Sequence, residues 1–239
     1  MGSQLIVSII PARGGSKSIP RKNLVKILGR PLIYYSIASS LASGVDRTIV
    51  STEDGEIASV ARQFGAEVVN RPPELAEDLT PTEPVIAHAI NELGLGDDDT
   101  VLLLQPTSPI RPSGLIDSAI ELYLDDLEDG YNALFTAHRE KYFYWRGGYG
   151  EDEWWSGIGF NYLETRQPRQ SLMDKKPLRE NGNIYITSAY IWTHYNRFGT
   201  RPVPLITESW MGIEIDEPYE IVVVEALMQY LINRGDIDA

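Results

Sequence analysis

A cluster of basic residues lies in the segment IIPARGGSKSIPRKNL, between Ile9 and Leu24. A short apolar run ends at Pro11, and the loop that follows contains two glycines and four cations: Arg13, Lys17, Arg21 and Lys22. A glycine-rich turn after a strand lets backbone N–H groups approach a phosphate chain closely, while cationic side chains neutralise its charge. Each charge-assisted contact contributes roughly 1.5–3 kcal/mol. The segment therefore predicts a site that holds a polyanion such as a triphosphate.

The composition of the chain makes this basic loop unusual. Among 239 residues, Lys+Arg 21 stand against Asp+Glu 34, which gives a net charge of −13. The field of such a chain repels nucleic acid and anionic membranes, so a phosphate ligand must be captured locally. The loop matches neither GxxxxGK[ST] nor GxGxxG, the two common nucleotide-binding fingerprints. The alternative interpretation is a solvated basic loop without a ligand.

This stretch resembles the amino-terminal signature of the acylneuraminate cytidylyltransferases, the CMP-sialic acid synthetase family, approximately [IL]xAR[GQ]xSKx[IL]PxKNL. The resemblance implies that Arg13, Lys17 and Lys22 are catalytic. It implies that the nucleotide contacts come from Ala12, Gly14, Gly15, Ser16 and Asn23. CMP-Kdo synthetases share the strand and loop but usually have Arg at position 17 and Lys-Pro at positions 22 and 23. That difference favours a nine-carbon sugar acid as substrate.

Two later segments resemble other parts of the same family. In RPPELAEDLTPTEPV, Arg71 and Thr82 match the polar ends of a nucleotide-recognition segment, RPxxLAxDxxxS, with threonine in place of serine. The alternative for Arg71 is a surface arginine at a strand end. In LLQPTSPIR, the resemblance places Gln105 against the sugar acid, while Thr107, Ser108 and Arg111 line or stiffen the same pocket. The alternative there is a proline-stiffened turn without a ligand.

The remaining sugar contacts are implied by the segments QPRQ and RENGNIYI. Arg169 is the expected partner of the substrate carboxylate, because a planar guanidinium matches a carboxylate at two points. Tyr185 and Phe198 match pocket aromatics of the family, and Gly199 stands where the family has a second phenylalanine. The alternative is that Tyr185 and Phe198 are ordinary core aromatics.

A pair of carboxylates near the carboxyl end predicts a magnesium site. In GIEIDEPYE, alternation through Ile213 and Ile215 predicts a strand with Glu214 and Asp216 on one face. Mg²⁺ takes one or two protein carboxylates together with phosphate oxygens. The resembling family has Asp-x-Asp here. Asp216 matches the second Asp and is the better-supported ligand, whereas Glu214 replaces the first Asp with a side chain that is one methylene longer. Glu220 begins a predicted helix, where capping is favoured over catalysis.

Alternating strands and helices must position these groups. The pattern predicts strands over Gln4–Ala12, Arg47–Ser51 and Ala66–Asn70, with helices over Pro31–Ser43 and Glu53–Phe64 between them. Such alternation implies an α/β fold, a Rossmann-like, mostly parallel sheet with helices on both faces and ligands beyond the carboxyl ends of the strands. The later predicted elements are helices over Glu83–Leu93, Ser113–Leu124 (capped by Ser113) and Pro218–Asn233, the last packed on the sheet, and strands over Val101–Gln105 and Asn132–Thr136.

The segment after this core has a different texture. Residues 140–190 contain WRGGYGEDEWW, which predicts a hairpin around Gly147 and Gly148 and a small β-rich insertion. The core would then comprise residues 1–139, completed by 191–239. A cluster of exposed tryptophans usually marks an interface. The resemblance implies that this insertion forms the contact of a homodimer. The alternative is that it forms a lid over the active site.

Several kinds of chemistry are excluded or disfavoured. The chain has no cysteine, and its three histidines (His88, His138, His194) share no metal-site spacing, so we interpret them as structural. No apolar run approaches the ~20 residues of a membrane span, and we expect no secretion signal, because the first residues lack its charged-then-apolar pattern. We therefore expect a cytoplasmic protein that binds neither membrane nor nucleic acid.

The resemblance implies a cytidylyltransferase reaction. The anomeric hydroxyl of a nine-carbon α-keto acid sugar attacks the α-phosphorus of CTP, and pyrophosphate leaves. Three alternatives stay open: the same reaction on legionaminic or pseudaminic acid, the same reaction on Kdo, and a non-catalytic nucleotide-binding module. No dedicated general base is visible in the sequence.

Overall fold

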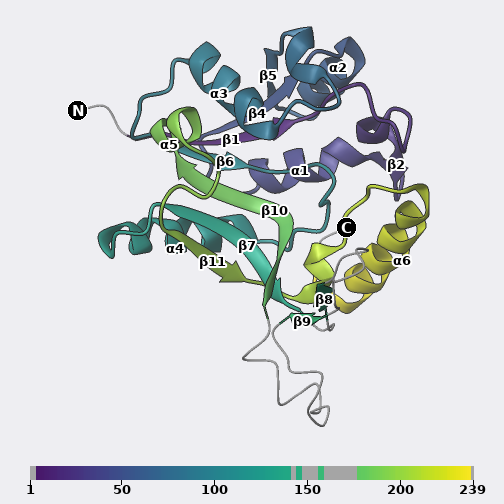
Figure 1. Ribbon diagram of the computed structural model, residues 1–239. Helices are drawn as coiled ribbons and strands as arrows, with labels where there is room; N and C mark the ends of the chain where they lie inside the picture. The colour runs from purple at the N-terminus through teal and green to yellow at the C-terminus, as the bar shows by residue number, and fades with distance from the viewer. Residues whose placement is uncertain (1–3, 141–143, 147–155, 159–176, 238–239) are drawn as a thin grey trace, which may run out of the picture.

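A seven-stranded sheet forms the centre of the molecule (Figure 1). The computed structural model describes residues 4–140, 144–146, 156–158 and 177–237. The strand order is β11-β7-β10-β6-β1-β4-β5, with all neighbours parallel except β10, which runs antiparallel to both β6 and β7. The strands are β1 (Ile6–Pro11), β4 (Arg47–Thr52), β5 (Glu67–Asn70), β6 (Thr100–Leu103), β7 (Ala133–Arg139), β10 (Leu178–Ser188) and β11 (Pro202–Ile206). The predicted fold class is confirmed.

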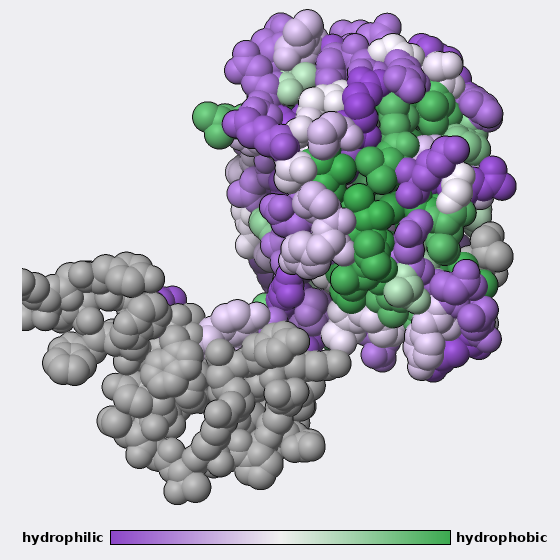
Figure 2. All heavy atoms as spheres, turned by 90° about the vertical axis from the view of Figure 1, so that its right-hand side faces the viewer, coloured by the Kyte–Doolittle hydropathy of each residue, from purple (hydrophilic) through white to green (hydrophobic). Residues whose placement is uncertain are grey.

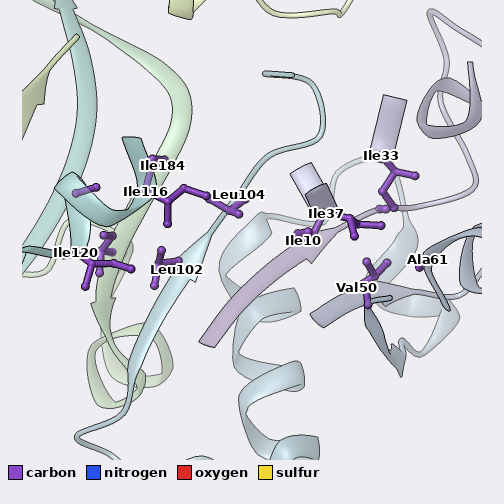
Figure 3. Packing of buried hydrophobic residues seen from close by; sticks show 14 of the residues in the cluster. Ile10, Ile33, Ile37, Val50, Ala61, Leu102, Leu104, Ile116, Ile120 and Ile184 are labelled. Carbon is purple, nitrogen blue, oxygen red and sulfur yellow. The ribbon is translucent and has the colours of Figure 1, made fainter. Parts of the chain in front are cut away.

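Apolar side chains on one face of the sheet pack against three helices: α1 (Leu32–Leu41), α2 (Gly55–Gln63) and α4 (Leu115–Glu128). Figure 3 shows this cluster, in which Ile10 of β1 and Val50 of β4 meet Ile37 of α1. Leu102 of β6 lies in the same cluster as Ile120 of α4. Successive side chains of a strand point to opposite faces, so this face takes every second residue of β1 and β6.

The other face is covered by α3 (Thr82–Leu93) and α5 (Ala189–His194). Here Val7 and Ile9 of β1 pack with Ile86 of α3 and Trp192 of α5. With apolar helices on both faces, the central strands are buried on two sides, as their nearly continuous apolar sequences predict.

The last helix, α6 (Pro218–Arg234), packs differently from our prediction. Its buried residues Val224 and Met228 share a cluster with Ile19 of the basic loop and with Ile215. Among the described residues, this cluster contains none from the seven-stranded sheet. The helix therefore holds the basic loop instead of covering the sheet. At its start, Glu217 and Glu220 form a capping box, which confirms the capping role of Glu220.

Two further local predictions were wrong. Ile213–Asp216 is not a strand: it follows the 3₁₀ turn η4 (Ser209–Gly212), and Ile215 donates its N–H to the carbonyl of Thr107 at 2.8 Å. The apolar alternation reflects burial of Ile215 against α6 and not pairing in a sheet. Gly114, at φ 78°, and not Ser113 is the N-cap of α4, and it makes no side-chain capping bond.

The predicted insertion is described only in part. Its strands β8 (Tyr144–Arg146) and β9 (Ser156–Ile158) pair antiparallel, which agrees with the predicted hairpin, whose connecting residues lie outside the described ranges. The predicted insertion of residues 140–190 extends too far, because residues 178–188 form β10 in the main sheet. The remaining short elements are η1 (Lys22–Leu24), β2 (Lys26–Ile27), β3 (Arg30–Pro31) and η2 (Pro73–Ala76). No helix in the described ranges is both long and apolar enough to cross a bilayer.

Candidate active site

A cavity of about 380 Å³ lies where the loops after β1, β5 and β6 meet. Because carboxyl ends of parallel strands share one edge of a sheet, three sequence blocks, within residues 11–23, 71–85 and 105–107, are brought together. Many of the predicted site residues line it: Arg13, Gly15, Ser16, Lys17, Lys22, Asn23, Arg71, Thr82, Gln105 and Thr107.

The cations in the cavity are paired with carboxylates. Asp78, from the loop before α3, accepts from Arg13 at 3.0 Å and from Lys17 at 2.9 Å. These contacts lower the pKa of Asp78, with the hydrogen bond from Lys17 the largest cause. Two cations converging on one carboxylate form a geometry that a phosphate group can also satisfy.

Lys22 is paired with the carboxylate predicted to bind metal. Its Nζ lies 2.9 Å from Oδ1 of Asp216 and 3.1 Å from the carbonyl oxygen of Ile215. The hydroxyl of Ser18 donates to the carbonyl of Asp216 as well. The structure thus brings the amino-terminal cations and the carboxyl-terminal acids to one place, although neither acid lines the cavity itself.

Arg21, the fourth cation of the loop, points elsewhere. Its backbone adopts a left-handed conformation, φ 56°, as the residue before η1. Its guanidinium binds Asp54 and also Glu56, the latter at 2.6 Å. The first contact lowers the pKa of Asp54, which caps α2. Arg21 therefore anchors the loop to α2 and is not part of the predicted polyanion-binding site.

Glu53 is a site residue that the sequence does not single out, because the helical pattern predicts position 53 as the start of a helix, whereas α2 begins at Gly55. Its Oε1 accepts from the backbone N–H of Gly14 at 2.7 Å, and its Oε2 accepts from Nη2 of Arg71 at 2.9 Å. Arg71 is buried, and burial is the main cause that lowers its pKa. Nε of Arg71 has no hydrogen-bond partner within the described part of the chain. The signal available in the sequence was a carboxylate directly after a strand adjacent to β1.

Three of the predicted residues converge over Gly182. A Cβ on Gly182 would lie 2.7 Å from Oε1 of Gln105 and 3.0 Å from Oγ of Ser108, and closer still to Oε1 of Glu214. Ser108 donates to Glu214 at 3.1 Å. Burial raises the pKa of Glu214, and the charge of Asp216 adds to that rise. The absence of a side chain at position 182 thus lets residues from the predicted sugar site and the predicted metal site come into contact.

We expect Gly182→Ala to lower both stability and activity. The residue has φ +67°, so alanine costs about 1–3 kcal/mol of strain, and its methyl group displaces Glu214. Gly94→Ala is a matched control, because Gly94 has φ +63° and no atom lies within 4 Å of the place that an added methyl group would take. Urea unfolding should show the backbone strain cost in both variants and a larger loss of stability in Gly182→Ala, where Glu214 must also move. Turnover should fall only in Gly182→Ala; equal turnover in the two variants would contradict the role of this contact.

The other predicted sugar residues lie elsewhere. Tyr185 is buried, its ring centroid lies 6.0 Å from that of Phe198, and its hydroxyl donates to Glu180. Within the described ranges, neither aromatic lines the cavity. Arg111 is buried and donates to the carbonyl of Gln105 at 2.8 Å, so it stiffens the turn. Ala12 and Gly14 are not among the residues that line the cavity, and Arg169 lies outside the described residues.

Histidines do not form a metal site. Among the described residues, no group of three or more His, Cys, Asp or Glu side chains is arranged to hold a metal ion. His88 lies in α3 and His138 in β7, on different elements.

The chain is similar in sequence to known cytidylyltransferases. A family model described as cytidylyltransferase matches residues 7–144. The N-acylneuraminate cytidylyltransferase of Escherichia coli is 30% identical over 236 residues, 98% of this chain. The alignment covers 54% of that protein, so the chain spans about half the length of this relative. The CMP-N,N'-diacetyllegionaminic acid synthase of Legionella pneumophila is 31% identical over 94% of this chain and 96% of its own.

The fold is also found among solved structures. A CMP:2-keto-3-deoxy-manno-octonic acid synthetase complexed with CTP superimposes with a TM-score of 0.69 at 18% identity. The match covers 95% of this chain and 99% of that one. At this identity the likeness concerns the fold alone.

Proposed function

The chain belongs to the cytidylyltransferase family, and we propose that it joins CTP to a nonulosonic sugar acid, giving the CMP-sugar and pyrophosphate. The observation that carries this proposal is the meeting of Lys22 with Asp216 at 2.9 Å beside a cavity lined by Arg13 and Lys17. A cluster of cations next to a carboxylate suits nucleotidyl transfer, in which a phosphorus atom is attacked and catalysis is mainly positioning and charge neutralisation.

The residues of this chain have separable tasks in the proposed reaction. Arg13 and Lys17, on one side of the cavity, bind the departing pyrophosphate. Lys22 stabilises charge that develops on the phosphate oxygens, and Arg71, which lines the cavity, contacts the nucleoside half. Gln105 faces the cavity, where it orients the sugar acid.

We also propose Mg²⁺ as the cofactor. Asp216 and Glu214 supply hard oxygen donors, and the charge of Asp216 adds to the effect of burial in raising the pKa of Glu214, as expected for two acids that lie close together. This donor set fits an ion held by one or two carboxylates plus substrate phosphates. Held by Asp216 and Glu214, such an ion would supply Lewis-acid stabilisation of the charge on the substrate phosphates.

The acceptor is the open variable in this proposal. One relative is named for N-acylneuraminate and another for N,N'-diacetyllegionaminic acid. Pyrophosphate release from CTP should be measured with N-acetylneuraminic, legionaminic and pseudaminic acids and with Kdo. We expect release with at least one nonulosonic acid. CTP binding without release in any mixture would instead support the non-catalytic nucleotide-binding module.

We further propose that the protein is a homodimer. An apolar stripe runs along the exposed side of α6, comprising Tyr219, Val222, Val223, Ala226 and Tyr230. Their spacing of three or four residues places them on one helical face. Figure 2, which views the molecule from the side of α6, shows an apolar patch there. Light scattering at micromolar concentration should give twice the chain mass of 26.8 kDa; a single-chain mass would exclude the dimer.

Asp78→Asn is expected to lower the KM for CTP by about twofold to fivefold, the range of a partly exposed ion pair. The carboxylate binds Arg13 and Lys17, the cations that we assign to the pyrophosphate, and therefore competes with it. Glu74→Gln, an exposed residue of η2, removes an equal charge without these contacts. Steady-state kinetics of both variants test this; a raised KM in Asp78→Asn would show that Asp78 supports binding.

A further inference from the structure

Glu53 occupies a special place in the sheet. It follows β4, which lies between β1 and β5 with both neighbours parallel. Backbone bonds continue past the strand ends, since Ala12 donates to the carbonyl of Ser51 and Arg71 donates to that of Thr52, both at 3.0 Å. The residue after β4 therefore lies between the basic loop on one side and the Arg71 segment on the other.

The side chain of Glu53 contacts both neighbours at once. One carboxylate oxygen accepts from Gly14 N at 2.7 Å and the other from Arg71 Nη2 at 2.9 Å. Close approach also requires glycine in the loop, because a Cβ on Gly14 would lie 3.0 Å from Cβ of Asp54. The turn after β4 thus holds the start of the basic loop in place through the contacts of Glu53 and Asp54 with Gly14.

Charge gives this bridge a second effect. The side chain of Arg71 is 4% exposed and that of Glu53 is 21% exposed. Burial and the charge of Arg13 both lower the pKa of Arg71, while Glu53 raises it. The carboxylate therefore compensates a desolvated guanidinium in the wall of the cavity.

We infer that Glu53 is a positioning residue that couples the phosphate half of the nucleotide site, through Gly14, to the nucleoside half, through Arg71. This inference rests on the proposed function for its assignment of the two halves. Lys22 is anchored separately, by Asp216 and the carbonyl of Ile215. Glu53 therefore governs nucleotide binding and leaves the reacting centre in place.

The test is Glu53→Gln. A glutamine side chain has one oxygen that accepts and one nitrogen that donates. Because Gly14 N and Arg71 Nη2 both donate, one of the two contacts is lost. We expect the KM for CTP to rise about tenfold, the effect of one unpaired buried donor, with kcat within about twofold of wild type. Glu56→Gln is the matched control, because Glu56 has the same charge, lies three residues away, has a side chain 69% exposed and contacts Arg21 instead. A fall in kcat at unchanged KM would overturn the inference.

Coupling through Arg71 has its own measurement. In an Arg71→Gln background the buried charge is gone, so adding Glu53→Gln should raise KM by much less than tenfold. If the two substitutions raise the KM for CTP by independent factors that multiply in the double variant, Glu53 does not act through Arg71. Glu53→Asp retains the charge but is too short to reach both partners, and it provides the same KM test if Glu53→Gln does not fold.

Inorganic tripolyphosphate separates this inference from the proposed function. Calorimetric titration should show weaker tripolyphosphate binding in Glu53→Gln than in wild type and in Glu56→Gln. If the wild-type chain releases no pyrophosphate with any sugar acid, the proposed function fails, and this titration still decides whether Glu53 positions the loop. Equal tripolyphosphate binding in all three proteins would overturn the inference.

Discussion

Lys22→Ala is expected to lower the rate of CTP-dependent pyrophosphate release by about a hundredfold to a thousandfold, the effect of removing one donor that stabilises transition-state charge. The ammonium group is mostly buried, with its side chain 15% exposed, and it has two oxygen partners from the 213–216 segment. Its loss removes positive charge beside the proposed phosphate site and removes the ion-pair partner of Asp216. Single-turnover measurements separate this loss from slow product release.

The fold should survive this change. Lys22 lies in the short turn η1, while Asn23, the next residue, holds the loop through its bond to the carbonyl of Arg13 at 2.9 Å. Lys26→Ala is the control, because Lys26 is an exposed lysine on β2. It should retain wild-type turnover, and both variants should keep the wild-type thermal midpoint. A Lys22→Ala protein with an unchanged rate would remove Lys22 from the mechanism.

Asp216→Asn should abolish the response of turnover to added Mg²⁺. An amide keeps the size of the side chain but supplies no negative charge, and Mg²⁺ prefers carboxylate oxygens. The same change weakens the contact with Lys22, so residual activity should be far below wild type at every metal concentration.

A titration of initial rate against MgCl₂ checks this result. Glu208→Gln is a suitable comparison, since Glu208 is exposed and makes no side-chain capping bond to η4. That variant should follow the wild-type curve. If Asp216→Asn also follows it, the ion is not held by Asp216, and the proposed cofactor site must lie elsewhere.

The fold class could be predicted because its signals are local. Apolar runs such as that of β1 and helix patterns such as that of α1 arise from neighbouring residues, and both elements lie within a few residues of the predicted bounds. Alternation of strand and helix implies parallel pairing by the handedness and length of the connections. The antiparallel insertion of β10 between β6 and β7 could not be inferred in this way.

In the basic loop, too, the local sequence predicts the kind of site, whereas the tertiary structure decides what each residue contacts. Its composition identified a polyanion site, but the roles of its four cations depended on partners distant in sequence. Lys22 meets Asp216, 194 residues away, whereas Arg21 turns to Asp54 and Glu56 and leaves the cavity. A side chain of this length can reach several positions, and the packed surroundings decide which one it takes.

The sequence by itself determined which chemical groups are available and where strands end: the cations of the loop, the two acids at 214 and 216, and the glycine at 182. The tertiary structure alone decided that α6 packs on the loop, that Gly182 admits three polar side chains, and that Glu53 bridges Gly14 to Arg71. The physical reason is that propensity and periodicity act between near neighbours, while these contacts follow from the order of strands in the sheet and from the burial that this order imposes.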